Sequence, residues 1–382
     1  MRCIKMKDIV IFKGTGAYDM MQYFADKLDL AFKEEGFESG IIDLNSLDKM
    51  QFADEIKQKK PKLCIGFNSM SFNYNNIAYY RYFDLKHLSI MVDHPIYHIP
   101  TIDLNYDNLY ILCNDVGRVN YLRNEIKIKN AYSMLLGADK NIECSSDKRD
   151  KDIVFFGTMI DYEELRKSWK VKFGKPINKL LNDAIEVGMY NSFLPVHEAL
   201  NISMSYNGYD KISENDKMKF QLVLLPEIDG YLRFFNRHKY IEKIKTHKIH
   251  IYGNDVWTKF LNRDNVILHS PVGINDSIEI LKRSKISLNA TMTLVYNGIT
   301  ERVLNSAMCG SVVLSNYTPL LHEIFKENAL LVDIKDMNNI DERLDDLINN
   351  DSKRNLMAEK ARNEVEMNHT WNNRVREIAN LI

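Results

Sequence analysis

The feature that most constrains the fold is a repeated alternation of short apolar runs with longer segments of helical period. Buried parallel strands are continuous runs of Ile, Val, Leu and Phe, and the helices between them carry apolar residues every three or four positions. The first half of the chain has strand candidates at 8–12, 40–44, 62–67, 88–92 and 109–113. The second half has them at 153–156, 249–252, 266–268, 286–289, 312–314 and 330–332. We therefore predict an α/β protein with two Rossmann-like lobes.

Local signals set the ends of several helices. The segment 17–35 has helical period and stops before Gly36, a residue suited to a C-cap. Asn114 or Asp115 is placed to cap a helix from 116 to about 126, because a short side-chain oxygen there accepts backbone N–H bonds. Pro226 interrupts the longest apolar stretch of a later helical region and predicts that no single unbroken helix runs through it.

The length of 382 residues is enough for two to three average domains. A polar stretch at 145–151 has the composition of a linker. We predict an N-terminal lobe at 1–145, and a C-terminal helix at about 365–382 is expected to pack back on it. The C-terminal lobe is predicted at 146–364, with a helical insertion at about 161–248.

Composition excludes several classes of protein. A formal net charge of −1 with 45% apolar residues argues against a polybasic nucleic-acid binder and against a disordered acidic chain. Five scattered cysteines without a CxxC pair argue against a disulfide framework and a zinc site. No apolar run reaches the roughly 18 residues of a membrane span. We predict a cytoplasmic protein with no transmembrane segment and no nucleic-acid partner.

Three glycine-containing turns follow predicted strands. In open α/β sheets, ligands collect at the carboxyl ends of the strands, where glycine lets a backbone approach a phosphate closely. Each turn taken alone is also explained as a tight strand-to-helix connection, but three of them favour a phosphorylated ligand. The candidate residues are Gly14 and Gly16 after the first strand, Gly157 and Thr158 after the sixth, and Gly253 and Asn254 after the seventh.

The stretch 284–310 combines a buried strand, a polar loop and a helix whose first turn carries Thr300, Glu301 and Arg302. A guanidinium at that point can bind a diphosphate through two parallel N–H···O hydrogen bonds, and the helix N-terminus adds backbone N–H donors. A surface ion pair between Arg302 and Glu301 is the alternative interpretation.

This stretch resembles the donor-binding signature of group 1 glycosyltransferases of the GT-B fold, and most closely their spore-maturation-protein-B-like branch. The matching positions are 284–289, Gly298, Arg302, Leu304, Ala307, Cys309 and Gly310. Further segments match in chain order at 135–139, 155–158, 251–253 with Trp257, and 369–371 with Arg374, and more weakly at 92–95.

The resemblance implies transfer of a sugar from a nucleotide-sugar donor, bound by the C-terminal lobe, to a hydroxyl acceptor held mainly by the N-terminal lobe. The acceptor expected is a cell-surface glycan, a spore or envelope component, or a protein such as flagellin. No metal and no other cofactor are expected. Donor contacts are expected from Gly14, Gly16, Gly157, Thr158, Tyr252, Gly253, Asn289, Asn297, Gly298, Thr300, Arg302 and Asn305. Arg302 is expected to stabilise the departing diphosphate, with Lys13 or Arg166 as further candidates.

One departure from the family pattern concerns two glutamates separated by seven residues, for which this chain has Asn297 and Asn305. An amide still donates to and accepts from ribose hydroxyls, but it carries no charge. The departure leaves the stereochemistry open and supports an alternative in which the chain is a non-catalytic GT-B-like partner subunit. A nucleotide-sugar epimerase of the same fold is a further alternative.

An inverting mechanism needs a base for the acceptor hydroxyl, and the loop 93–98 follows an apolar strand with three titratable residues. Asp93 and His94 are the candidates because they lie nearest the strand end. Ordinary loop packing is the alternative for His94, and capping of the turn before Pro95 is the alternative for Asp93.

The helical insertion carries a basic run, which is predicted to be a solvated helix face interleaved with Glu242. Contact with membrane lipid or an acidic partner is the alternative. The run consists of Arg233, Arg237, His238, Lys239, Lys243, Lys245 and Lys248.

Overall fold

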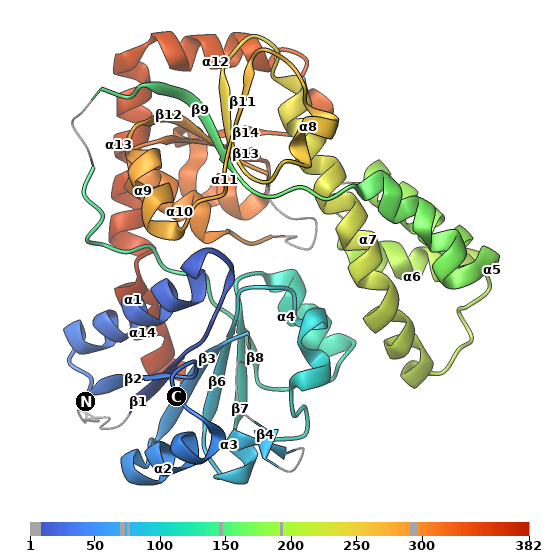
Figure 1. Ribbon diagram of the computed structural model, residues 1–382, viewed down its shortest axis with the longest axis vertical. Coiled ribbons are helices and arrows are strands. Elements are labelled where there is room, and N and C mark those ends of the chain that lie inside the picture. The colour runs from blue at the N-terminus through green and yellow to red at the C-terminus, as the bar shows by residue number, and fades with distance from the viewer. Residues whose placement is uncertain are drawn as a thin grey trace. The chain divides into compact units, whose positions relative to one another are not determined.

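The computed structural model describes residues 9–68, 73–74, 77–144, 148–191, 194–290 and 297–381. Three features discussed above lie outside the described residues. They are Cys3, Asp8 at the start of the predicted strand 8–12, and residues 145–147 of the predicted linker. The chain divides into two compact units, 1–141 with 366–382, and 142–365. Each unit has its own parallel six-stranded sheet (Figure 1).

The first unit has the strand order β2-β1-β3-β6-β7-β8. Its strands are β1 (Ile9–Lys13), β2 (Ser39–Asp43), β3 (Leu63–Phe67), β6 (His87–Met91), β7 (Leu109–Cys113) and the short β8 (Ala131–Ser133). A two-stranded hairpin adds β4 (Asn73–Tyr74) and β5 (Ile77–Ala78). The five strands expected here are all present, whereas β8 and the hairpin were not expected. The helices are α1 (Met20–Glu34), α2 (Lys49–Lys59), α3 (Tyr79–Tyr82), α4 (Val116–Asn124) and α14 (Trp371–Leu381).

The C-terminal helix α14 belongs to this unit and packs on α1 (Figure 1). Trp371, which begins α14, places its ring 5.6 Å from that of Phe24 and is fully buried. The backbone N–H of Trp371 donates to Ala138 at 3.0 Å. Helix α14 is therefore part of the helical layer that packs on the first unit's sheet. In the same unit Asp115 caps α4, accepting from the Arg118 N–H at 3.0 Å, as one of the two predicted caps.

The second unit has the strand order β11-β10-β9-β12-β13-β14. These strands are β9 (Lys151–Phe156), β10 (Ile249–Tyr252), β11 (Val266–His269), β12 (Ser284–Asn289), β13 (Val312–Asn316) and β14 (Leu330–Val332), and all six were expected. The helices around the sheet are α8 (Trp257–Phe260), α9 (Ile274–Lys282), α10 (Glu301–Met308), α11 (Pro319–Phe325), α12 (Ile340–Asn349) and α13 (Asp351–Asn368), the last of which ends in the first unit.

The predicted insertion is helical and consists of α5 (Tyr162–Tyr190), α6 (Val196–Tyr206) and α7 (Glu214–Lys243), which pack on one another (Figure 1). α5 is kinked at Gly174, whose φ is 75°. The prediction from Pro226 is wrong, because α7 runs unbroken through it for 30 residues. A proline removes only one backbone hydrogen bond and costs roughly 3 kcal/mol, while buried residues on both sides, such as Leu225 and Ile228, hold the helix against its neighbours.

Candidate functional site

The glycine turns after β9 and β10 touch one another. The N–H of Gly157 donates to the Tyr252 carbonyl at 3.1 Å, and Trp257 Nε1 donates to the Gly157 carbonyl at 2.8 Å. A Cβ at position 253 would lie only 2.4 Å from the Gly157 carbonyl oxygen and 2.8 Å from Trp257 Nε1. Glycine is therefore required at 253 by the close approach of the two strand ends.

Asn254 fixes the continuation of the β9 turn. Its Oδ1 accepts from the Met159 N–H at 2.7 Å, and its Nδ2 donates to the Met159 carbonyl at 2.8 Å. These two hydrogen bonds resemble those between paired strands, and they hold the backbone that follows β9 in a defined conformation. Asn254 belongs to the third glycine turn predicted from the sequence, although it was not among the expected donor contacts.

Arg302 reaches from the first turn of α10 to the end of β9. Its Nη1 donates to the Phe156 carbonyl at 2.6 Å, and its Nε lies 3.8 Å from Glu301 Oε1. Arg302 therefore reaches the strand end where a diphosphate could bind, and it also lies near Glu301, its alternative partner from the sequence. Because the side chain keeps 31% of its exposure, its charge remains accessible to a ligand at the carboxyl end of the sheet.

Arg237 brings a second guanidinium to the same loop from α7. Its Nη1 donates to the Thr158 carbonyl at 2.9 Å, and its Nε is buried without a hydrogen-bond partner among the described residues. Burial, followed by the positive charges of Arg302 and Arg233, lowers the pKa of Arg237 to about 9. The described residues pair no carboxylate with this side chain. The site therefore holds more positive charge than the protein neutralises.

The prediction of a solvated face for the basic run is wrong at Arg237 and His238, which are only 7% and 8% exposed. His238 accepts or donates at Nδ1 with the Tyr162 hydroxyl at 2.8 Å, which ties α7 to the start of α5. The signal was present in the sequence: Phe234, Tyr240 and Ile241 lie three or four positions from Arg237 and are buried with it.

The predicted asparagines have different surroundings. Asn289 ends β12, is 3% exposed, and has a buried Oδ1 with no partner among the described residues. Asn297 Oδ1 accepts from the Leu320 N–H at 2.8 Å and so helps to cap α11. Asn305 is buried on α10. Thr300 precedes α10 without a side-chain capping bond, and Gly298 is buried just before it.

Tyr252 is packed in an aromatic column rather than projecting into solvent. Its ring stacks on Phe156 at 5.1 Å and on His269 at 4.5 Å, and it is only 8% exposed. The column supports the ends of β9, β10 and β11 below the glycine turns. Arg166, the further cation considered from the sequence, lies on α5, where its Nε donates to Asn182 at 2.7 Å.

In the first unit the predicted residues Gly14 and Gly16 follow β1. Gly14 is buried, and a Cβ on Gly16 would lie 2.5 Å from Met21 Cγ, so these residues make a tight turn into α1. Lys13 is engaged by the Asp26 carboxylate at 2.8 Å.

Asp93 and His94 follow β6 but differ in accessibility. The Asp93 side chain is half-exposed and its Oδ2 accepts from Asn68 Nδ2 at 2.8 Å, while Asn68 Oδ1 accepts from the Asp93 N–H at 3.1 Å. His94 is 3% exposed, and its Nδ1 accepts from the Ile96 N–H at 3.1 Å. An accepting Nδ1 places the proton of the neutral ring on Nε2. Asp93 is the more accessible of the two candidate bases.

Arg118 braces this loop from below. The buried guanidinium donates through Nη1 to the Val92 carbonyl at 3.0 Å and to Asn114 Oδ1 at 2.7 Å. The carboxyl ends of β3, β6 and β7 thus meet in a polar cluster that includes Asn68, Asn114 and Arg118. Sequence reasoning did not assign these three residues to a site, because only the sheet order brings them beside Asp93.

In the part of the chain that the structure describes, no group of three or more His, Cys, Asp or Glu side chains is arranged to hold a metal ion. No helix in that part of the chain is long and apolar enough to cross a bilayer.

Comparison with known proteins gives a family match and several matches of fold. Residues 234–380 match the model of a family described as glycosyl transferase-like. Among solved structures, T4 phage BGT in complex with UDP-glucose is 12% identical over 97% of this chain and 99% of its own, with a TM-score of 0.55. An α-glucosyltransferase in complex with UDP and a 13-mer DNA is 12% identical over 98% of both chains, with a TM-score of 0.56. A glycosyltransferase from Rickettsia africae is 10% identical over 98% of this chain and 97% of its own, with a TM-score of 0.52.

These matches confirm the predicted GT-B fold, and the family model bears out the predicted enzyme class, a glycosyltransferase, over the residues that it matches. No curated protein matches the chain.

Proposed function

We propose that the chain is a glycosyltransferase that moves a sugar from a nucleotide-sugar donor, bound at the carboxyl ends of β9, β10 and β12, to a hydroxyl of a glycan or protein acceptor. The finer assignment to the spore-maturation-protein-B-like branch remains part of this proposal, as does a cytoplasmic location. The fold and the glycosyltransferase-like match over residues 234–380 support the reaction class.

The observation that carries the proposal is the pair of guanidiniums at the β9 turn. Arg302 and Arg237 donate to carbonyls two residues apart, those of Phe156 and Thr158. Arg302 has Glu301 nearby, whereas the described residues pair no carboxylate with the buried Arg237. Carbonyl dipoles neutralise the charge of Arg237 only in part, and a buried cation is stable only when it is paired. A diphosphate carries the opposite charge and accepts several hydrogen bonds, so it satisfies both groups. The same contacts would stabilise the negative charge that develops as the diphosphate departs, without a metal ion.

Asp93 is the proposed base for the acceptor hydroxyl if the reaction inverts. Its half-exposed carboxylate is oriented by Asn68, and Arg118 supports the loop that carries it. A general base must lie within hydrogen-bond reach of the proton it accepts, which favours the accessible Asp93 over the buried His94.

The first experiment measures thermal stabilisation by a panel of nucleoside diphosphates and nucleotide sugars, in EDTA and with added Mg²⁺ or Mn²⁺. We expect one nucleotide to stabilise the protein in EDTA. The product formed from that donor, with and without candidate glycans and proteins, then identifies the reaction. A DNA acceptor belongs in the same panel, because one of the similar structures contains DNA.

Two results would contradict the proposal. If no nucleotide stabilises the protein, the alternative of a non-catalytic partner subunit gains support. If the donor sugar is converted to an epimer with no acceptor present, the protein is an epimerase of the same fold.

Arg302→Ala tests the diphosphate contact. Loss of a hydrogen bond to a charged group is worth about 1.5–3 kcal/mol, so we expect kcat/KM to fall by about tenfold or more. Asp93→Asn keeps the size of the side chain and its acceptor oxygen for Asn68, and we expect it to reduce kcat with little change in donor affinity. Unchanged transfer by either variant with a proven donor removes that residue from the reaction.

A further inference from the structure

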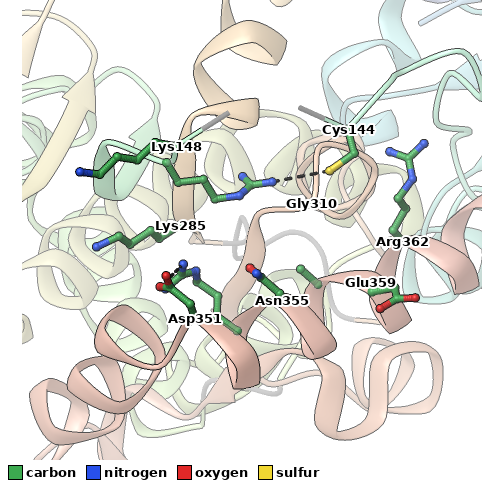
Figure 2. A pocket seen from close by; sticks show the side chains of 11 residues that line it. Cys144, Lys148, Lys285, Gly310, Asp351, Asn355, Glu359 and Arg362 are labelled. Atoms are coloured by element: carbon green, nitrogen blue, oxygen red, sulfur yellow. Dashed lines mark hydrogen bonds and ion pairs between the residues drawn. The ribbon is translucent and has the colours of Figure 1, made fainter. Parts of the chain in front are cut away.

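A polar pocket lies at the amino ends of the strands in the second unit's sheet, whereas the glycine turns lie at their carboxyl ends. Its volume is about 590 Å³, and it is lined at the amino ends of β9, β12 and β13 and along α13. Figure 2 shows Asp351, Asn355, Glu359 and Arg362 along α13, facing the segments that carry Cys144 and Gly310. β9 spans six residues, which at about 3.3 Å per residue separates this α13 pocket from the glycine turns by roughly 20 Å.

Positive charge dominates the α13 pocket. Five cationic side chains line it, together with the carboxylates of Asp351 and Glu359. The cations are Lys148, Arg149, Lys285, Arg354 and Arg362. Arg354 donates to Asp351 at 2.6 Å, and Lys285 donates to Asp152 at 2.8 Å. The described residues pair no carboxylate with Arg149 or Lys148, so an excess of positive charge remains.

Arg149 is held in place by backbone rather than by an acid. Its Nη1 donates to the Ser284 carbonyl at 2.6 Å, and its Nη2 donates to the Cys309 carbonyl at 2.8 Å. Gly310, at φ 71°, makes room for it, because a Cβ there would lie 2.7 Å from Arg149 Nη2. Burial of the guanidinium lowers the pKa of Arg149. A ligand of negative charge would stabilise this arrangement.

A second, independent observation comes from Arg354. This side chain is 5% exposed, and its Nη1 donates to the carbonyls of Leu347 and Ile348, each at 3.0 Å. Its Nε is buried without a hydrogen-bond partner among the described residues. A buried donor without an acceptor is rare and costs about 1–3 kcal/mol. Arg354 lines the pocket from the first turn of the 18-residue helix α13, where the positive end of the helix dipole also favours an anion.

We propose that the α13 pocket binds a small phosphorylated anion at a site separate from the donor site. A phosphate group carries up to two negative charges and accepts hydrogen bonds from several directions, which suits cations that approach from β12, α13 and the segment before β9. The pocket belongs to one unit and does not depend on the identity of the sugar donor.

Cys144 provides a local reporter for this site. Its side chain lines the pocket, and its Sγ accepts from Arg149 Nη2 at 3.7 Å (Figure 2). It is exposed, whereas Cys64, Cys113 and Cys309 are buried. In a Cys3→Ser background, the rate of Cys144 alkylation by a maleimide is measured with and without inorganic pyrophosphate at constant ionic strength.

We expect alkylation to slow by about tenfold at ten times the Kd for pyrophosphate, because only the unoccupied pocket reacts. Lys148→Ala with Lys285→Gln should abolish this protection. The matched control, Lys170→Ala with Lys175→Gln, removes two exposed lysines from α5 and should retain it. Arg302→Ala, which disables the proposed donor site, should also retain it.

Three results would overturn the proposal: an alkylation rate that pyrophosphate does not change, protection that persists in the Lys148 and Lys285 variant, and protection that disappears in Arg302→Ala. Thermal unfolding of each variant, measured in parallel, establishes that the comparison is made between folded proteins. Failure of the donor proposal alone would leave the Cys144 result unaffected.

Discussion

Arg237→Met should make the protein more stable without ligand and less able to bind its donor. In the folded protein the pKa of Arg237 falls from 12.5 to about 9. At about 1.4 kcal/mol per pKa unit, holding this charge in its buried position costs on the order of 5 kcal/mol. Methionine removes the charge and keeps much of the length of the side chain. It also leaves the Thr158 carbonyl without its donor, which costs about 1–3 kcal/mol.

The net expectation is a rise of about 2–4 kcal/mol in the free energy of unfolding of the ligand-free protein, from the difference between those two effects. Donor affinity should change in the opposite direction. Loss of one charge-assisted hydrogen bond is worth about 1.5–3 kcal/mol, so the Kd for the nucleotide should rise by about tenfold to a hundredfold. Urea unfolding measures the first quantity, and isothermal titration calorimetry with the nucleotide measures the second.

Arg233→Met is the matched control, since it makes the same substitution one turn earlier on α7. Arg233 forms an ion pair with Asp229, a fully buried carboxylate. Breaking a buried ion pair costs about 3–5 kcal/mol, so this variant should be destabilised, while its nucleotide affinity should change less than that of Arg237→Met. If Arg237→Met is destabilised like the control and binds the nucleotide normally, Arg237 is a structural residue and the argument from its buried charge is wrong.

Two further predictions concern the glycine turn and the pH dependence of stability. Gly253→Ala should destabilise the protein by about 1–3 kcal/mol and weaken nucleotide binding, because its Cβ would lie 2.4 Å from the Gly157 carbonyl oxygen; calorimetry and urea unfolding of Gly40→Ala, where a Cβ meets nothing within 4 Å, should show no comparable change. His87 is fully buried, and burial lowers its pKa to about 3. As the pH falls from about 6.5 toward 3, the unfolded chain therefore binds a proton that the folded protein does not. The free energy of unfolding should fall by about 1.4 kcal/mol per pH unit over this range. Urea unfolding of His87→Gln should show a shallower pH dependence, and an unchanged slope would exclude His87 as its source.

The strands of both sheets were predictable because buried parallel strands leave an unambiguous apolar signature. The strand at Ala131–Ser133 was missed because three residues are too few for a pattern. Arg237 was misassigned because its charge was weighed above its position in the buried stripe of α7. Asn68 and Arg118 could not be found from sequence, since they reach Asp93 only through the neighbouring order of β3, β6 and β7. Strands and turns can be recognised from short segments of sequence. Which side chains come into contact depends on the order of the strands in the sheet, which short segments do not determine.

The position of Arg237 also bears on why a helical insertion occurs at this point of the fold. The insertion leaves the sheet after β9 and returns to it before β10, the two strands whose glycine turns touch. Both of its ends are therefore fixed beside the candidate donor site, through the capping of α5 by Asp161 and the contact of Tyr162 with His238. A cation carried by α7 is thus held near the β9 turn by the connectivity of the chain as well as by packing. Because burial of that cation is unfavourable in the absence of an anion, a bound diphosphate would offset the unfavourable term, and donor binding should stabilise the insertion together with the sheet.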